Sequence, residues 1–482
     1  MANAQLNTPI LTGGILNTNF FNGRVLAAED LTALQTANAQ QRRQLARAIG
    51  DGVAWGLDVK LNPGNDPAQP VVHVSSGLAL NRRGDAVAMS ADVNLALVKT
   101  LDAQAASNGL FAACNPPQTM VPTNLDCYIL TASPASGLQG SAPMTDIVGS
   151  GFASSCASAN VVEGVQFNLV PLGIANTSST SGLGKQALQL YSTLESEFVT
   201  LAGLTDPTAI ANLQAQIAPN LSLFQNVVAH LCFGTDTLAT FAANPLALTD
   251  GKSTFVKYGL LDDLRDQGYL TDCAVPLALI YWTVAGVQFV DTWAVRRSVT
   301  RIGTTYFWPL LMNDRRIRES AAMFLQFEDQ LQSILASVTD LTTVTADSYF
   351  AYLPPAGMVP VTADGIPAVS GSPSSPGLDM GGFFAAHASK DIATTYGDLL
   401  RELFSSGLDY EPIQLAQAGE IQLYLLWENL QNINAGGSAQ LALIFASPAM
   451  RYRGVPHFAP QGEVDGPGWA RWGLSRFAPH VI

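Results

Sequence analysis

The chain has 482 residues, of which 48% are hydrophobic and 13% are charged, and its formal net charge is −14. This composition excludes an intrinsically disordered chain, because disorder requires few apolar residues and many charges. The negative charge argues against a nucleic-acid partner, since nucleic-acid binding depends mainly on clustered Lys and Arg. The length exceeds one ordinary hydrophobic core, so several domains are expected.

The first hundred residues predict a helix, two strands and a hairpin, in that order. Apolar residues at helical spacing predict the helix over Ala28–Ile49, and Asn38 and Gln41 occupy the middle of its apolar stripe. A stripe interrupted by amides is expected to pack on a partner that is only partly apolar. The elements expected after the helix are strands at 55–59 and 71–76 and a tight hairpin at 77–89.

The charges of this helix match its dipole at both ends. Glu29 and Asp30 lie in the first turn, and Arg42, Arg43 and Arg47 lie in the last two turns. We interpret these arginines as a solvated face, with a binding patch as the alternative.

The middle of the chain changes from strand to helix signals and back. Apolar runs at 127–132 and 165–175, separated by Gly-, Pro- and Ser-rich stretches, predict a β region with long loops. Between 185 and 231 the helical period returns and predicts an αα-hairpin, with Pro207 near the start of its second helix. Residues 273–290 carry no charge, and we interpret them as a buried hairpin around Gly286, with a membrane span as the alternative.

The last third predicts a long helix and further strands. The helix spans Asp314–Ser337 and begins with three arginines, which oppose its dipole and need an acidic neighbour such as Asp262 or Asp263. Residues 349–361 are expected to be extended because consecutive prolines fix φ. The remaining predictions are a mobile loop at 362–379, a helical piece at 392–404, strands at 420–427 and 440–446, and an aromatic tail.

No constellation with a known chemistry is found. The histidines are too widely spaced for a metal motif, the nucleophile elbow Gly-x-Ser-x-Gly is absent, and the acids that could form an active-site pair have no distinctive spacing. Arg83-Gly84-Asp85 spells an adhesion tripeptide but is interpreted as a turn. The sequence therefore predicts a non-enzyme without metal or cofactor. These histidines and acids are His73, His230, His387, His457, His480, Asp262, Asp263, Asp272 and Asp291.

Five cysteines form no CxxC motif and are interpreted as buried or reduced thiols. A bridge between two of Cys114, Cys127 and Cys156 is the alternative. The N-terminus has no basic region before Arg24, so no cleaved secretory signal is expected. Folding in the cytoplasm is predicted, with release from the cell as part of a larger particle as the alternative.

Several segments resemble one known group of proteins. Phe20-Phe21-Asn22-Gly23-Arg24 before the helix and Gly77-Leu78-Ala79-Leu80 in the hairpin resemble the opening module of proteins encoded with phage-tail-like contractile injection systems. Looser similarity is found at 293–297, at 352–357 and at the end of the chain. The resemblance implies a structural, baseplate-associated component present in several copies, with baseplate, sheath or tube subunits as partners, and it transfers no catalytic residue.

The expected fold class is multidomain α+β. The expected parts are an N-terminal helix and hairpin adaptor module at 1–100, a β-rich region at 101–180, a helical insertion at 181–250, a β-hairpin and long-helix region at 251–361, a flexible loop at 362–380 and a C-terminal α+β region at 381–482. The residues expected to make contacts with other subunits are Phe20, Phe21, Arg24, Arg42, Arg43, Arg47, Trp469, Trp472 and Phe477.

Two other functions remain open at this stage. The first is a receptor- or glycan-binding protein at the tip of a fibre or spike, in which tryptophans stack on sugars. The second is a glycoside hydrolase with a scattered acid pair. The tail aromatics need a docking surface, either on this chain or on a neighbouring subunit. The tryptophans considered as sugar platforms are Trp282, Trp293, Trp308 and Trp427.

Overall fold

The structure is a computed structural model of the whole chain. The residues that it describes are 14–22, 25, 27–62, 69–97, 111, 114, 126–145, 153–174, 182–235, 259–299, 314–338, 340–361, 380–384, 387, 393–395, 412–427 and 441–447. Helices and antiparallel sheets occur together in these ranges, so the predicted α+β class is confirmed.

The N-terminal module is one long helix followed by two small antiparallel sheets. The helix is α1 (Ala28–Ile49), as predicted. One sheet has the order β1-β4-β5 and the other has the order β2-β3-β6. Their strands are β1 (Gly52–Gly56), β2 (Val59–Leu61), β3 (Val71–Val74), β4 (Gly77–Leu80), β5 (Ala86–Met89) and β6 (Val93–Ala96).

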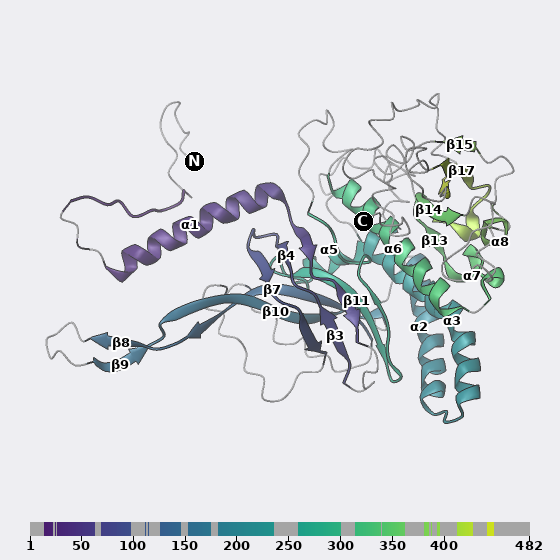
Figure 1. Cartoon of the computed structure of the whole chain (residues 1–482), viewed down its shortest axis with the longest axis horizontal. Helices are drawn as coiled ribbons and strands as arrows, with labels where there is room; N and C mark the ends of the chain where they lie inside the picture. The colour runs from purple at the N-terminus through teal and green to yellow at the C-terminus, as the bar shows by residue number, and fades with distance from the viewer. Residues whose placement is uncertain are drawn as a thin grey trace, which may run out of the picture.

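A central four-stranded sheet joins distant parts of the chain in the order β10-β7-β11-β12. One face packs against the N-terminal sheets through residues such as Leu130, Ile280 and Val72. The other face packs against helices through residues such as Ile129, Tyr281 and Phe224. The sheet is therefore the middle layer of the body (Figure 1). Its strands are β7 (Cys127–Gln139), β10 (Asn160–Pro171), β11 (Val275–Thr283) and β12 (Gly286–Asp291).

Strands β7 and β10 are longer than their partners and run out of the body as a two-stranded ribbon. Strand β11 pairs with β7 only as far as Ala132, whereas β10 continues to pair with β7 as far as Gln139. The ribbon leads into a hairpin of β8 (Ala142–Thr145) and β9 (Ala153–Ala157). Figure 1 shows this ribbon and α1 extending from the same side of the body.

The helical layer contains the predicted αα-hairpin, α2 (Gly182–Ala202) and α3 (Pro207–Phe233). Asp206 caps α3 by accepting a hydrogen bond from the Thr208 amide at 3.2 Å, and Pro207 occupies the first turn, where no intrahelical amide bond is lost. The short helix α5 (Gly259–Asp266) adds Leu261 and Leu264 to the same core.

The long helix α6 (Asp314–Ser337) connects two cores. Ala322 and Met323 pack in the core beneath the central sheet, and Phe327 and Leu331 pack in a C-terminal core. The C-terminal core is built on a sheet of order β14-β18-β17-β15, with Pro360 in its edge strand β14. Its elements include α7 (Ala346–Tyr349), β14 (Ala356–Val361), α8 (Met380–Phe384), β15 (Ala393–Thr395), β17 (Gln422–Trp427) and β18 (Leu441–Ala446), with a small pair of β13 (Tyr352–Leu353) and β16 (Ile413–Gln414).

Most of the elements predicted within the described ranges are present. The uncharged stretch at 273–290 forms the predicted hairpin of β11 and β12, and no helix among the described residues is long and apolar enough to cross a membrane. The helical prediction for 392–404 is wrong at 393–395, where β15 pairs in parallel with β17. The predicted loop at 362–379 lies outside the described residues.

The prediction of reduced thiols is wrong for two cysteines. Cys114 and Cys273 form a disulfide that joins positions 159 residues apart. Neither proposed partner of Cys114 takes part, since Cys127 is buried as a thiol and Cys156 is an exposed thiol. Cys232 is also a buried thiol. The bond ties the segment before β7 to the start of β11.

Candidate interaction surfaces

Helix α1 is attached to the body mainly at its C-terminal half. Arg43 forms an ion pair with the buried carboxylate of Asp85, and Arg47 Nε donates to the Arg83 carbonyl at 2.9 Å. Gly84 lies between these two contacts with φ +83°, and a Cβ there would lie 2.3 Å from the Arg43 carbonyl oxygen. The hairpin tip therefore requires glycine both for its turn and for the close approach of the helix backbone.

The Arg-Gly-Asp tripeptide forms contacts within its own chain. Asp85 is only 5% exposed, its amide donates to Asn81 Oδ1 at 2.8 Å, and its carboxylate holds Arg43. A receptor could not reach this carboxylate without displacing α1. This contact agrees with the interpretation of the tripeptide as a turn.

The remaining surface of α1 is largely open. Ala37 is its one buried residue among those described, while Leu31 is 51% exposed and Leu45 is 69% exposed. The segment before the helix runs back along it, and Thr18 Oγ1 donates to the Asp30 carbonyl at 2.9 Å. Helix α1 thus leaves most of its amide-interrupted apolar stripe exposed to solvent.

The predicted contact residues fall into three groups. Phe20, Phe21 and Arg42 are exposed on the N-terminal segment and α1. Arg43 and Arg47 bind the hairpin of their own chain, as described above. The others, Arg24, Trp469, Trp472 and Phe477, lie outside the described residues.

The β7–β10 ribbon is a second open surface. Leu138 and Val161 pair across the two strands and are 64% and 51% exposed. On the other face Val162 is also exposed. A two-stranded ribbon has little stability in water without a further layer, so these apolar residues are expected to contact another surface. The sequence did not reveal the ribbon, because its outer part is rich in Ser, Gly and Ala.

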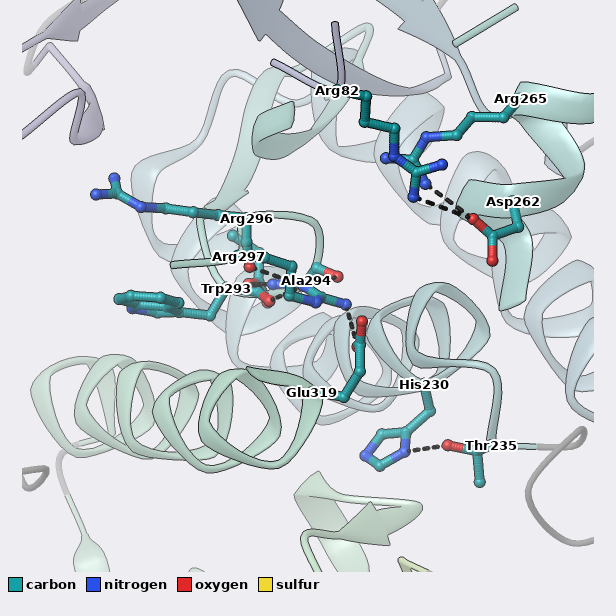
Figure 2. Close-up of polar contacts among 11 residues, drawn as sticks. Arg82, His230, Thr235, Asp262, Arg265, Trp293, Ala294, Arg296, Arg297 and Glu319 are labelled. Atoms are coloured by element: carbon teal, nitrogen blue, oxygen red, sulfur yellow. Dashed lines mark hydrogen bonds and ion pairs between the residues drawn. The ribbon is translucent and has the colours of Figure 1, made fainter. Parts of the chain in front are cut away.

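The turn after β12, which carries Arg296 and Arg297 (Figure 2), attaches the N-terminal module to the body. Arg296 is buried and donates to the Gly56 carbonyl at 2.6 Å, to the Leu57 carbonyl at 3.1 Å and to Asp58 at 3.0 Å. Gly56 and Leu57 both have positive φ, at 62° and 55°. This conformation is rare for leucine, and the guanidinium group holds it by donating to both carbonyls at once.

The neighbouring Arg297 fixes the same turn to α6. Its Nη1 donates to the carbonyls of Trp293, Ala294 and Arg296, and its Nη2 lies 2.6 Å from Glu319 Oε2. Both side chains of the ion pair are buried. Such a pair is costly to break because one charge would remain unpaired inside the protein.

A polar cavity of about 230 Å³ lies between this turn, α5 and the hairpin of the N-terminal module. On one side Asp262 binds Arg265 at 2.9 Å and Arg82 at 3.7 Å, and Asp51 lies 3.5 Å from Arg82. Burial, followed by the proximity of Arg82, lowers the pKa of Arg265 to about 10. The cavity thus brings together three arginines and three acids, so the positive and negative charges are equal in number. The arginines are Arg82, Arg265 and Arg297, and the acids are Asp51, Asp262 and Glu319. We interpret the cavity as part of the junction between the N-terminal module and the rest of the body.

Asp262 was one of the acids considered for catalysis and for the start of α6. It is held by Arg82 and Arg265 (Figure 2), and the side chains of the α6 arginines lie outside the described residues. Asp291 belongs to a separate network, in which Gln225 and Gln326 donate to its Oδ2 at 2.8 and 3.0 Å. Burial raises the pKa of Asp291. Each acid has a structural role in joining elements.

The histidines within the described ranges are single residues with structural partners, and His457 and His480 lie outside those ranges. His230 is buried, and its Nδ1 lies 2.8 Å from Thr235 Oγ1 (Figure 2). Its ring also stacks on Tyr352. Burial lowers the pKa of His230 to about 3, so the ring is neutral. His387 lies 3.0 Å from Asp347. Among the residues described, no three His, Cys, Asp or Glu side chains gather into a possible metal site.

The tryptophans considered for sugar binding are not open platforms where the structure describes them. Trp282 is buried in the core of the central sheet. The Arg296 guanidinium lies over the Trp293 ring, 5.4 Å from the ring centroid. Trp308 and the side chain of Trp427 lie outside the described parts of the chain.

The open surfaces on α1 and on the ribbon therefore remain the candidate sites. The comparisons with known proteins do not assign them: no protein family matches the chain, and no curated protein matches it.

Proposed function

We propose that this chain is a structural subunit of a phage-tail-like contractile injection particle, associated with its baseplate, and that it works through contacts with other subunits. The observation that carries the proposal is the pair of elements that extend from the body in Figure 1, α1 and the β7–β10 ribbon. Each has apolar side chains exposed to solvent. Exposed apolar surface of this kind is typical of subunit contacts.

The construction of the body supports a role in positioning. Arg296 and Arg297 fix the N-terminal module, the central sheet and α6 to one another through buried donors. An element projecting from a rigid base can hold a partner at a defined place, whereas one on a loose base cannot. The base of α1 is rigid in this sense, because the hairpin at Gly84 holds its last two turns.

The sequence resemblance supports the same assignment. Two of the segments that carry it make contacts with the N-terminal module. The hairpin at 77–89 binds α1 through the Arg83 carbonyl, and the segment 293–297 binds the sheets of the module through Arg296. Baseplate, sheath or tube subunits are the proposed partners, in several copies per particle, and neither nucleic acid nor catalysis is part of the proposal.

The disulfide supports a final location outside the cytoplasm. Disulfides persist in oxidising surroundings and are rare in the reducing cytosol. We therefore propose assembly in the cytoplasm followed by release of the particle, with the Cys114–Cys273 bond forming late.

The test is purification of contractile particles from cells that make this chain, followed by mass spectrometry and cryo-electron microscopy. We expect the chain near the baseplate at a fixed copy number. Leu138→Asp/Val161→Asp should reduce incorporation, while the control Leu16→Asp, also at an exposed apolar residue, should reduce it less. If purified sheath–tube particles never contain the chain, the proposal is wrong.

A further inference from the structure

The exposed stripe of α1 has the spacing of a coiled coil. Leu31, Asn38 and Leu45 recur every seventh residue, and Leu34, Gln41 and Ala48 follow each of them by three residues. These are the a and d positions of three consecutive heptads. All are exposed except Leu34, which is half-buried. A single helix gains nothing from this pattern, whereas two paired helices bury it.

The stripe lies away from the contacts that attach the helix. At about 100° per residue, Leu45 lies about 160° around the helix from Arg43, and Leu31 lies about 160° from Arg47. Arg43 and Arg47 are the side chains that bind the hairpin. The N-terminal end of α1 also stands clear of the sheets (Figure 1). A second helix can therefore approach the stripe without displacing the hairpin.

We propose that α1 pairs in antiparallel orientation with α1 of a second copy of this chain through this stripe. The proposal rests on the proposed function only in that the chain acts as an assembly subunit. Antiparallel pairing about the middle of the stripe places Leu31 against Ala48 of the second copy, Leu34 against Leu45, and Asn38 against Gln41. Large residues meet small ones at the ends, and each amide meets an amide that can both donate and accept.

Charge favours the same occupant and the same orientation. Glu29 and Asp30 lie in the first turn of α1, and Arg47 lies in the last. Antiparallel pairing brings the acidic end of each copy to within about one helical turn of Arg47 of the other, and it also opposes the two helix dipoles. A parallel pair would place like ends together. The polar layer of Asn38 and Gln41 fixes the register, because a slipped pair would bury an amide against leucine.

The antiparallel pair is compatible with the shape of the molecule. The body is joined to the C-terminal end of α1 through β1, so the two bodies lie at opposite ends of the helix pair. The helix of 22 residues is about 33 Å long, which separates the two attachment points. The pair is isologous and closes as a dimer with two-fold symmetry.

The test is sedimentation of the full chain over a concentration series. We expect a monomer–dimer equilibrium that Leu31→Asp/Leu45→Asp weakens at least tenfold, with the fold kept by circular dichroism. The matched control Leu138→Asp, at an exposed leucine of the ribbon, should leave the equilibrium unchanged. Asn38→Leu/Gln41→Leu should tighten it at least tenfold, a gain that misfolding could not produce.

Cysteine pairs test the orientation in a Cys156→Ser background. Leu31→Cys/Ala48→Cys should form a covalent dimer on mild oxidation, and Leu31→Cys alone should not; the reverse result means a parallel pair and overturns the orientation. A wild-type chain that stays monomeric up to about 100 μM overturns the pairing. If the chain is monomeric but is found in the particles, the pairing is wrong and the proposed function stands. If the chain dimerises but is absent from the particles, the proposed function is wrong and the pairing stands.

Discussion

Helices α1 and α3 are both long, but their side chains face opposite surroundings. Helix α3 buries apolar residues such as Phe224 together with polar ones such as Asn226, whose Oδ1 accepts hydrogen bonds from the amides of Ala351 and Tyr352. Helix α1 buries Ala37 alone among its described residues. The difference shows that similar helical patterns can have different surroundings: α3 packs in the core of the fold, and α1 leaves most of its stripe exposed to solvent.

This comparison predicts that substitutions in the buried body lower the stability of the chain, whereas substitutions on α1 and the ribbon change assembly.

The largest effect is expected for Arg296→Ala. It leaves the carbonyls of Gly56 and Leu57 without their donor, at a cost of about 3–5 kcal/mol in the free energy of unfolding. Urea denaturation measures it. Arg42→Ala, at an exposed arginine of α1, is the control and should change stability by less than about 0.5 kcal/mol. Equal losses of stability in Arg296→Ala and Arg42→Ala would contradict the distinction between the buried body and the surface of α1.

Gly84→Ala tests the attachment between the two regions. Alanine at this position would have to keep a positive φ, and its Cβ would collide with the Arg43 carbonyl oxygen. We therefore expect the free energy of unfolding to fall by at least about 1–2 kcal/mol. Hydrogen exchange should locate the effect in α1. Gly137→Ala on the ribbon is the matched control, because a Cβ added there would have no other atom within 4 Å. Unchanged protection of α1 in Gly84→Ala would contradict this account.

Acid should affect α3 through His230. The folded pKa of about 3 lies below the unfolded value of about 6.5, so the unfolded state binds the proton first as the pH falls. The stabilisation is complete above about pH 6.5 and is lost towards pH 3, at about 1.4 kcal/mol per pH unit.

Stability curves of the wild type and His230→Gln, measured between these pH values, should therefore differ in slope by that amount. Asp126, whose pKa burial raises to about 6, affects both proteins alike. His73→Gln, at a half-buried histidine of β3, serves as the control. Parallel curves for the wild type and His230→Gln would show that the ring takes up its proton while still folded.

The smallest effect on stability is expected on the ribbon. Leu138→Asp should change the free energy of unfolding by less than about 0.5 kcal/mol, because the side chain is already in solvent. Thermal melts measure it. A large loss would place Leu138 in the body of the fold and would remove the ribbon from the candidate surfaces.

The sequence predicted the elements whose signal is local. Helical spacing located α1, α2, α3 and α6, and the uncharged, strand-type run around Gly286 located β11 and β12. It did not predict contacts between distant segments, such as Arg296 with the Gly56 carbonyl or Cys114 with Cys273. Periodicity describes one element at a time, and these contacts exist only once the sheets are stacked. It also missed β15, a short strand that its parallel partner β17 determines.

The candidate surfaces were predicted in part. The amide-interrupted stripe of α1 was visible from Asn38 and Gln41, and the exposure of Leu45 confirms that the described fold leaves it uncovered. The separate role of Arg43 could not be read from the helix alone, because its partner Asp85 belongs to a hairpin whose placement depends on tertiary packing.

The bond between Cys114 and Cys273 encloses the ribbon and the α2–α3 hairpin within one covalent loop. A protease that cuts the turn between α2 and α3 therefore divides the backbone without separating its pieces. The nicked chain would migrate as one species on a non-reducing gel and as two after a reductant is added. The pieces of a chain cut at this turn therefore stay covalently joined for as long as the disulfide is intact, and a reducing environment removes this protection.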